Sequence, residues 1–69
     1  MKISARNMLE GTVKRVVHGA VNSEITIELK GGEKVVSIIT KSSAENLKLE
    51  KGKKIFAVIK ASNVMVATE

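Results

Sequence analysis

The clearest pattern in the sequence is a strict alternation of apolar and polar positions over residues 23–30. Alternation with a period of two predicts a β-strand that buries one face and exposes the other. A Gly-Gly pair follows at 31–32, and residues 34–39 are again rich in β-branched side chains. Because glycine permits the positive φ angles of a tight turn, this stretch predicts a hairpin whose buried face carries Ile25, Ile27 and Leu29.

Three further apolar-rich segments predict the remaining strands, at residues 11–17, 54–59 and 64–67. A glycine within residues 18–20 predicts a turn or bulge after the first of these segments, before the apolar pattern resumes at Val21. The predicted strands therefore number five.

A single helix is predicted between the hairpin and residue 54. Ser42 and Glu45 form a Ser-x-x-Glu capping box ahead of an apolar set. That set consists of Ala44, Leu47 and Leu49. The spacing predicts about two turns of helix, and Gly52 breaks the chain before the next strand.

This order of elements predicts an all-β fold with one short helix. The specific expectation is an OB-fold-like five-stranded barrel, closed or partly open, and the same order is compatible with a sandwich. The sequence has no proline, linker, repeat or low-complexity tract. We therefore expect a single domain over residues 1–69.

The size of the chain limits its stability. A domain of 69 residues buries only roughly 60% of the surface that its unfolded chain exposes. Small domains rely on disulfides, a structural metal or oligomerisation, and this sequence has no cysteine and one histidine. Oligomerisation is thus the expected source of extra stability. A chain without cysteine also suits a reducing compartment, so we expect a cytoplasmic location.

The charge balance predicts an anionic partner. Twelve Lys and Arg residues against seven Asp and Glu residues give a formal charge of +5. Proteins that bind single-stranded nucleic acid stack bases on aromatic side chains, and Phe56 is the only aromatic residue here. A small anion is therefore favoured over nucleic acid. No signal-like segment or apolar run of about 18 residues occurs, so we expect no membrane partner.

Three short stretches have the composition of an oxyanion site. Residues 4–7 (Ser-Ala-Arg-Asn) and 59–62 (Ile-Lys-Ala-Ser) each combine one cation with small donors and no bulky neighbour. Residues 40–43 (Thr-Lys-Ser-Ser) open the predicted helix, and helix N-termini attract anions. By contrast, the basic run around residues 48–54 is expected to be a solvated helix exit.

The order and spacing of these stretches resemble the Mop, or molbindin, domain of molybdate-binding proteins, which is TOBE-like. The resemblance spans essentially the whole chain. It rests on Ser4-Ala5-Arg6-Asn7, Leu9-x-Gly11-x-Val13, Gly19-x-Val21-Asn22-x-Glu24, Ile39-Thr40 with Ser43, Leu47-x-Leu49-x-x-Gly52, and Ile59-Lys60-Ala61 with Val64.

The resemblance implies a free-standing OB-like barrel that assembles as a homo-oligomer, a hexamer built as a trimer of dimers. It implies that molybdate or tungstate binds at subunit interfaces, in the cytoplasm, for molybdenum storage or homeostasis. No chemistry is performed on the anion, so no enzyme activity, no cofactor beyond the anion and no metal cation site are expected.

By position, the resemblance divides the main anion site into two walls. The first wall consists of Ser4, Ala5, Arg6, Lys60 and Ala61. The opposite wall, from a neighbouring subunit, consists of Thr40 and Ser43. For Arg6 the donor, backbone N–H or guanidinium, stays open. For Ser42 we expect helix capping rather than a ligand role.

A second anion site, near a symmetry axis, is implied for one further segment. Its residues are His18, Gly19, Ala20, Val21 and Asn22. At such an axis each copy contributes a few donors. His18 has no second His, Cys or Asp at coordination spacing, so it does not predict a metal ligand. Because histidine titrates near neutrality, pH sensitivity of this site is left open.

Two other function classes are weighed against anion binding. The positive charge and the barrel also suit an OB-type nucleic-acid-binding module, which the lack of aromatic residues opposes. An enzyme would require a reactive constellation, and the sequence offers no cysteine nucleophile, no histidine pair and no carboxylate pair with an evident cleft. The preference for molybdate or tungstate, and for storage, buffering or delivery, stays open.

Overall fold

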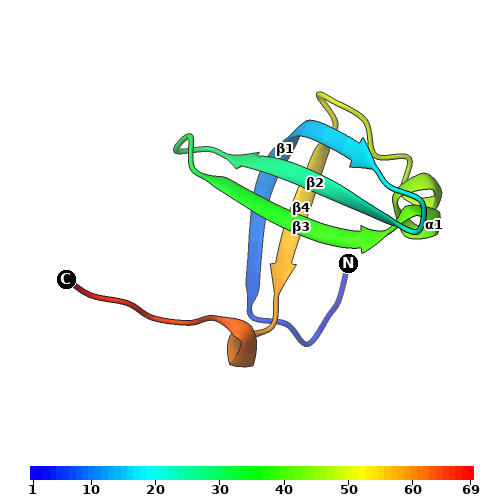
Figure 1. The fold of residues 1–69 in the computed structure, drawn as a ribbon. Helices are drawn as coiled ribbons and strands as arrows, with labels where there is room; N and C mark the ends of the chain where they lie inside the picture. Colours follow the sequence, from blue (N-terminus) through cyan, green and yellow to red (C-terminus); the bar gives the residue numbers. More distant parts are fainter.

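The computed structural model describes all 69 residues as four strands, one α-helix and one 3₁₀ turn (Figure 1). In chain order these are β1 (Asn7–His18), β2 (Asn22–Leu29), β3 (Lys34–Thr40), α1 (Lys41–Asn46), β4 (Lys54–Ile59) and η1 (Ala61–Asn63). The strands form one antiparallel sheet in the order β3-β2-β1-β4. The predicted mostly-β fold with one short helix is confirmed. No helix has the length and apolar character needed to cross a membrane.

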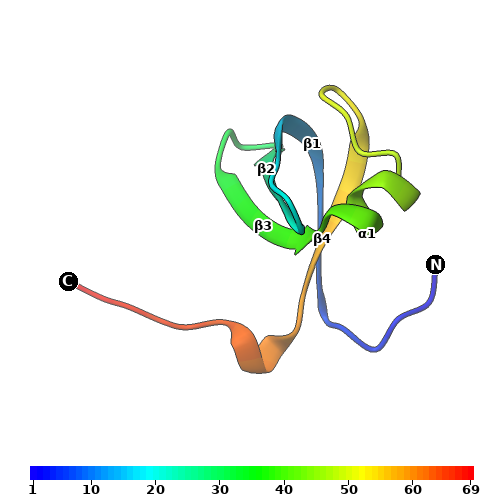
Figure 2. The same cartoon turned by 45° about the vertical axis from the view of Figure 1, so that its right-hand side comes forward.

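The sheet curls because β1 is shared between two partners. Residues 7–12 of β1 pair with β4, and residues 11–18 pair with β2. The register shifts between Val13 and Arg15, and such a bulge bends a strand and increases its twist. The result is a half-barrel (Figure 2). The strand predicted at residues 11–17 is thus the second half of a longer one.

The predicted β2–β3 hairpin is confirmed. Glu28 lies opposite Lys34, and residues 30–33 form the turn. The Leu29 N–H donates to the Glu33 carbonyl at 2.8 Å, and the Gly32 N–H donates to the Leu29 carbonyl at 3.0 Å. Of the two glycines only Gly32 has a positive φ, at 92°. The second glycine of the pair is therefore the one that the turn requires.

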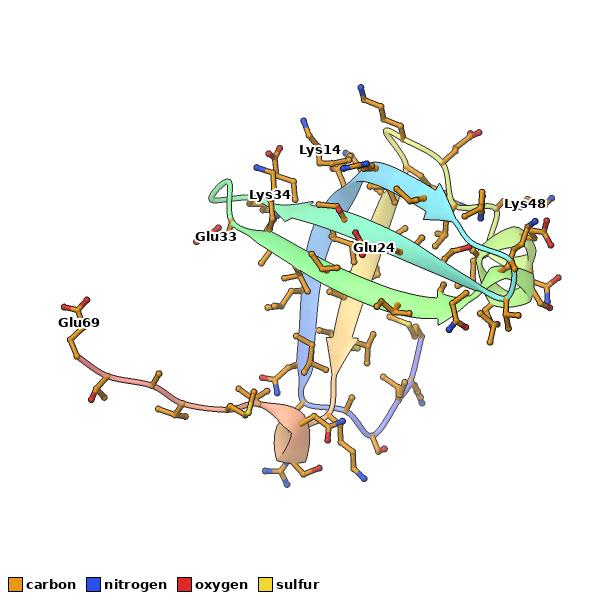
Figure 3. The ribbon with its side chains drawn as sticks, in the orientation of Figure 1. Lys14, Glu24, Glu33, Lys34, Lys48 and Glu69 are labelled. Atoms are coloured by element: carbon orange, nitrogen blue, oxygen red, sulfur yellow. The ribbon has the colours of Figure 1, made fainter.

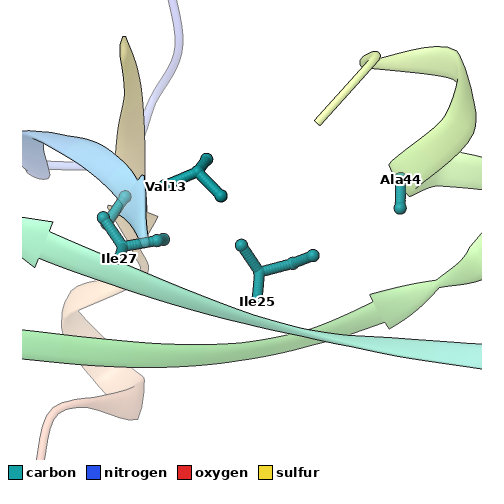
Figure 4. Packing of buried hydrophobic residues seen from close by; sticks show 5 residues of the cluster. Val13, Ile25, Ile27 and Ala44 are labelled. Carbon is teal, nitrogen blue, oxygen red and sulfur yellow. The ribbon is translucent and has the colours of Figure 1, made fainter. Parts of the chain in front are cut away.

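The hydrophobic core is small and lies inside the curl of the sheet. Only seven of the 69 residues are buried. The apolar ones are Val13, Ile25, Ile27, Ala44 and Ala57 (Figure 4). Ala44 comes from α1, so the helix contributes directly to this core. A core of this size supports the expectation that a single chain has little stability of its own.

The helix is shorter than the two turns predicted. It ends at Asn46, and Lys48 has a φ of 53°. The Lys53 ammonium donates to the Leu47 carbonyl at 2.6 Å and so satisfies an acceptor at the helix end. The predicted break at Gly52 is confirmed by its φ of 94°.

One side of the half-barrel is open. β3 and β4 are the two edges of the sheet and do not pair with each other. Between them lies a cleft of about 440 Å³, in which 13 of 15 lining residues are hydrophobic. Its walls include Val35, Ile39, Ile55 and Ile59. The closed form of the predicted barrel is therefore not reached within one chain.

The fifth strand predicted at residues 64–67 is absent from the chain. After η1 the tail leaves the sheet and runs away from it (Figure 1). Met65 and Val66 are 93% and 88% exposed, and residues 65–69 form no backbone hydrogen bond. Because η1 turns the chain away from the free strand edges, this strand-forming segment has no edge to pair with.

Gly11→Ala is expected to destabilise the fold by about 1–3 kcal/mol, since a Cβ there would lie 2.7 Å from the Glu28 carbonyl oxygen and 2.8 Å from Ile27 Cγ2. The measurement is denaturant unfolding at a fixed protein concentration. Gly32→Ala is the control, because its Cβ meets no atom within 4 Å and only the positive φ is strained. A loss at Gly11 no larger than at Gly32 would contradict the close-approach argument.

Candidate anion-binding site

The first wall of the predicted site is assembled in the structure. An open pocket of about 400 Å³ is lined by residues from both ends of the chain. They are Ile3, Ser4, Ala5, Arg6, Lys60, Ala61 and Ser62. The β1–β4 pairing brings these segments together, since Asn7 lies opposite Ile59 and its side-chain amide donates to the Ile59 carbonyl at 3.2 Å. All five residues predicted for this wall line the pocket.

The two cations of this pocket have no carboxylate partner. Neither Arg6 nor Lys60 takes part in an ion pair, and both are exposed. Lys60 precedes η1 without a side-chain hydrogen bond to it. Because no acidic residue lines the pocket, its charge is uncompensated and attracts an anion.

Ser62 is a pocket residue that the site prediction missed. It lies in η1 and adds a hydroxyl beside Lys60. The sequence feature that could have identified Ser62 is its position in the motif at residues 59–62, directly after two residues that were assigned to the first wall.

The predicted second wall lies at the start of α1, and here the capping assignment was wrong. The N-cap is Thr40, not Ser42. The Thr40 hydroxyl accepts a hydrogen bond from the Ser43 N–H at 3.0 Å and donates to the Ser43 hydroxyl oxygen at 2.8 Å. β3 ends at Thr40 in extended geometry, which is the conformation an N-cap needs.

These two bonds give Thr40 and Ser43 different roles. The single proton of the Thr40 hydroxyl is donated within the chain, whereas the Ser43 hydroxyl keeps its proton free to donate. Since α1 has only six residues, its dipole is small, and the hydroxyl is the stronger contribution of this wall. Ser43 is therefore the ligand candidate and Thr40 the residue that orients it.

The two walls do not meet within one chain. Neither Thr40 nor Ser43 lines the pocket that contains Lys60. Figure 1 shows α1 at the end of β3 and η1 beyond the end of β4, on different sides of the half-barrel.

The segment predicted as a second anion site forms the β1–β2 turn. His18 Nδ1 lies 2.6 Å from the Ser23 hydroxyl, and the Gly19 N–H donates to the Asn22 carbonyl at 2.7 Å. The Val21 carbonyl accepts from the Lys41 N–H at 2.8 Å. This turn thus adjoins the start of α1 and lies outside the Lys60 pocket.

The remaining cations are dispersed over the surface. Lys14 and Lys34 both contact Glu28, at 3.8 Å, far from Lys48 beside α1 (Figure 3). Lys53 is engaged by the helix end. A continuous basic track of the kind that follows a nucleic-acid backbone is therefore not formed by these lysines.

Comparison with known proteins supplies an independent view of this chain. The model of the TOBE domain matches residues 3–66. Molybdenum-pterin-binding protein 3 of Clostridium pasteurianum is 47% identical over 66 residues, which cover 96% of this chain and 97% of that protein. The molybdenum transport protein ModE of Azotobacter vinelandii is 46% identical over 69 residues, and the chain spans only 26% of it.

Two solved structures share this fold. A molybdate binding protein from Sporomusa ovata has a TM-score of 0.93 and 43% identity, covering 99% of this chain and 100% of its own. The cytoplasmic molybdate-binding protein ModG, with molybdate bound, has a TM-score of 0.90 and 49% identity, covering 94% of this chain and 46% of its own. These relatives are named for binding or transport, so the prediction of a non-enzyme is confirmed. The chain belongs to the TOBE domain family, and its predicted resemblance to the Mop proteins is confirmed.

Proposed function

We propose that this protein binds molybdate or tungstate as a free oxyanion in the cytoplasm and holds it for molybdenum storage or homeostasis. One observation carries the proposal: Arg6 and Lys60 face a pocket without any carboxylate to neutralise them. The names of the aligned binding proteins support molybdate as the ligand, and the description of ModG supports the cytoplasmic location.

The anion binds between two copies of the chain. The pocket supplies the cations Arg6 and Lys60, and the α1 start of a neighbouring copy supplies the Ser43 hydroxyl. Two positive charges with short neutral donors suit a compact dianion. The separation of the two walls within one chain supports this arrangement.

A free anion fits the pocket better than a molybdenum–pterin complex. A pterin ring requires a flat stacking surface together with several fixed hydrogen-bond partners. Phe56, the only aromatic residue, is half exposed on β4 and does not line the pocket that contains Lys60. The pocket therefore offers charge and small donors, which is what an oxyanion uses.

The barrel is completed to five strands in a homo-oligomer. The edges of β3 and β4 flank the apolar cleft, and residues 64–67 of the tail pair with no strand of their own chain. Unpaired strand edges accept an additional strand, and the tail of a neighbouring copy has the required extended form and apolar side chains. The Mop resemblance supports a hexamer built as a trimer of dimers.

The β1–β2 turn forms a second anion site at a symmetry axis. His18 keeps Nε2 available because Ser23 engages Nδ1, and the turn residues Gly19, Ala20, Val21 and Asn22 are exposed. Symmetry-related copies would each add a few donors to such a site.

Native mass spectrometry with molybdate is the direct test of the proposed function. The oligomer is expected to gain several molybdate ions and no sulfate at the same concentration, because donors spaced for the larger ion leave sulfate under-coordinated. A monomer that gains neither anion would overturn the proposal. Tight, salt-sensitive binding in an oligonucleotide titration would then favour the nucleic-acid module.

Lys60→Ala is expected to weaken molybdate binding about 10- to 100-fold, since hydrogen bonds to charged groups contribute about 1.5–3 kcal/mol. Isothermal titration calorimetry at fixed ionic strength measures the change. Lys51→Ala is the matched control, because it removes the same charge from an exposed turn outside the pocket. Equal effects of the two substitutions would reduce the role of Lys60 to general electrostatics.

Removal of residues 64–69 is expected to lower the oligomeric state and to leave the apolar cleft uncovered, because it deletes the proposed exchanged strand. Size-exclusion chromatography with light scattering gives the mass of the assembly. A variant that lacks only residues 68–69 retains the apolar segment and serves as the control. An unchanged mass after the longer deletion would refute strand exchange by the tail.

A further inference from the structure

Ser23 is the one buried polar side chain in the structure, at 1% exposure. Its hydroxyl oxygen lies 2.6 Å from His18 Nδ1, on the opposite strand of the β1–β2 pair. A buried hydroxyl without a partner destabilises a fold by about 1–3 kcal/mol, so this pairing is a fixed feature of the turn. The main anion site, formed by the pocket that contains Lys60 and by the Ser43 wall, does not include this pair.

The His18–Ser23 pair is connected to the start of α1 through a short series of contacts. It closes the base of the β1–β2 turn, whose Val21 carbonyl accepts from the Lys41 N–H at 2.8 Å. Next in the sheet, Asn22 lies opposite Thr40. Thr40 in turn holds both the N–H and the hydroxyl of Ser43. The buried serine, the β1–β2 turn and the helix start that carries the proposed ligand hydroxyl are therefore neighbours, joined by the Val21–Lys41 backbone hydrogen bond.

The part of α1 that follows Ser43 is anchored independently. Ala44 lies in the hydrophobic core, and Lys53 binds the Leu47 carbonyl. Loss of the Ser23 hydroxyl would thus leave the helix in place and loosen only its first residues. Those residues are the ones that carry the second wall of the anion site.

We propose that Ser23 and His18 are positioning residues that set the discrimination between molybdate and smaller tetrahedral dianions. The inference rests on the proposed function and identifies what makes the Ser43 wall rigid. Arg6 and Lys60 attract any dianion. Discrimination between large and small dianions therefore requires a donor that is held at a fixed distance from the two cations. The contacts from Ser23 to Ser43 provide that fixed position.

The first experiment compares Ser23→Ala with the unmodified chain in separate titrations with molybdate and sulfate. Molybdate affinity is expected to fall about tenfold, as is typical when a supporting hydrogen bond is removed, while sulfate affinity stays nearly constant. Thr26→Val is the matched control, because Thr26 lies on β2 like Ser23, forms no side-chain hydrogen bond and lines neither the apolar cleft nor the pocket that contains Lys60. A lower melting temperature with an unchanged ratio of the two affinities would show a structural role only and overturn the inference.

A double-mutant cycle tests the pairing of the two residues. His18→Ala should reduce the affinity ratio as Ser23→Ala does, and the double variant should lose little more, because both substitutions break one interaction. Additive losses would show that the two residues act separately and would contradict a shared positioning role.

A ligand-free measurement separates this inference from the proposed function. Ser23→Ala is expected to accelerate hydrogen exchange at the Lys41 amide, which the Val21 carbonyl protects, without a similar change at the Leu47 amide. Unchanged exchange at Lys41 would overturn the positioning link whatever the protein binds. Faster exchange in a chain that binds no molybdate would retain the link and reject the proposed function.

Discussion

One continuous strand, β1, must serve two partners that lie in different directions, and the rest of the structure depends on this constraint. At Gly11 the strand pairs with Leu29 on one side and Ile55 on the other. The missing side chain lets the Glu28 carbonyl approach where a Cβ would stand. The first half of β1 then carries residues 4–6 to Lys60, and the second half holds β2 and the turn beside α1. The bend in β1 therefore sets the distance between the two walls.

The same bend leaves the barrel open, so the stability of the fold and the proposed anion binding both depend on contact with a second copy. Five buried apolar residues and four strands provide a small core, with an apolar cleft at the unpaired edges. A second copy that covers the cleft removes this surface from water, which is favourable. In the proposed assembly the second copy also brings the Ser43 hydroxyl to the pocket that contains Lys60. In the proposed arrangement, an anion bound between copies would stabilise the assembly by mass action, so that ligand binding and oligomerisation would reinforce each other.

Local sequence signals predicted the parts of the structure that local chemistry determines. The alternation of apolar and polar residues and the glycine pair were sufficient to predict the β2–β3 hairpin. Gly52 was sufficient to predict the turn before β4. The incorrect predictions concern residues whose structure depends on a partner that is distant in the sequence. Residues 64–67 have the composition of a strand, but a strand requires an edge to pair with. Ser42 fits a capping box, yet β3 extends to Thr40 and makes that residue the cap. The Ser23 and His18 pair depends on the β1–β2 register, which no short motif encodes.

In the candidate site, the residues that attract an anion are different from the residues that would discriminate between anions of different size. Molybdate and sulfate have the same charge and shape, so the long side chains of Arg6 and Lys60 attract both and adapt to either. A size preference has to come from a short donor that cannot follow the smaller ion. Thr40 fixes the Ser43 hydroxyl, and the Val21–Lys41 backbone hydrogen bond holds the chain directly after Thr40. Since the Ser43 hydroxyl and the two cations lie on different sides of the half-barrel, a single chain carries both without bringing them together. Selective binding is in this view a property of the assembled protein, and each chain contributes attraction to one site and discrimination to another.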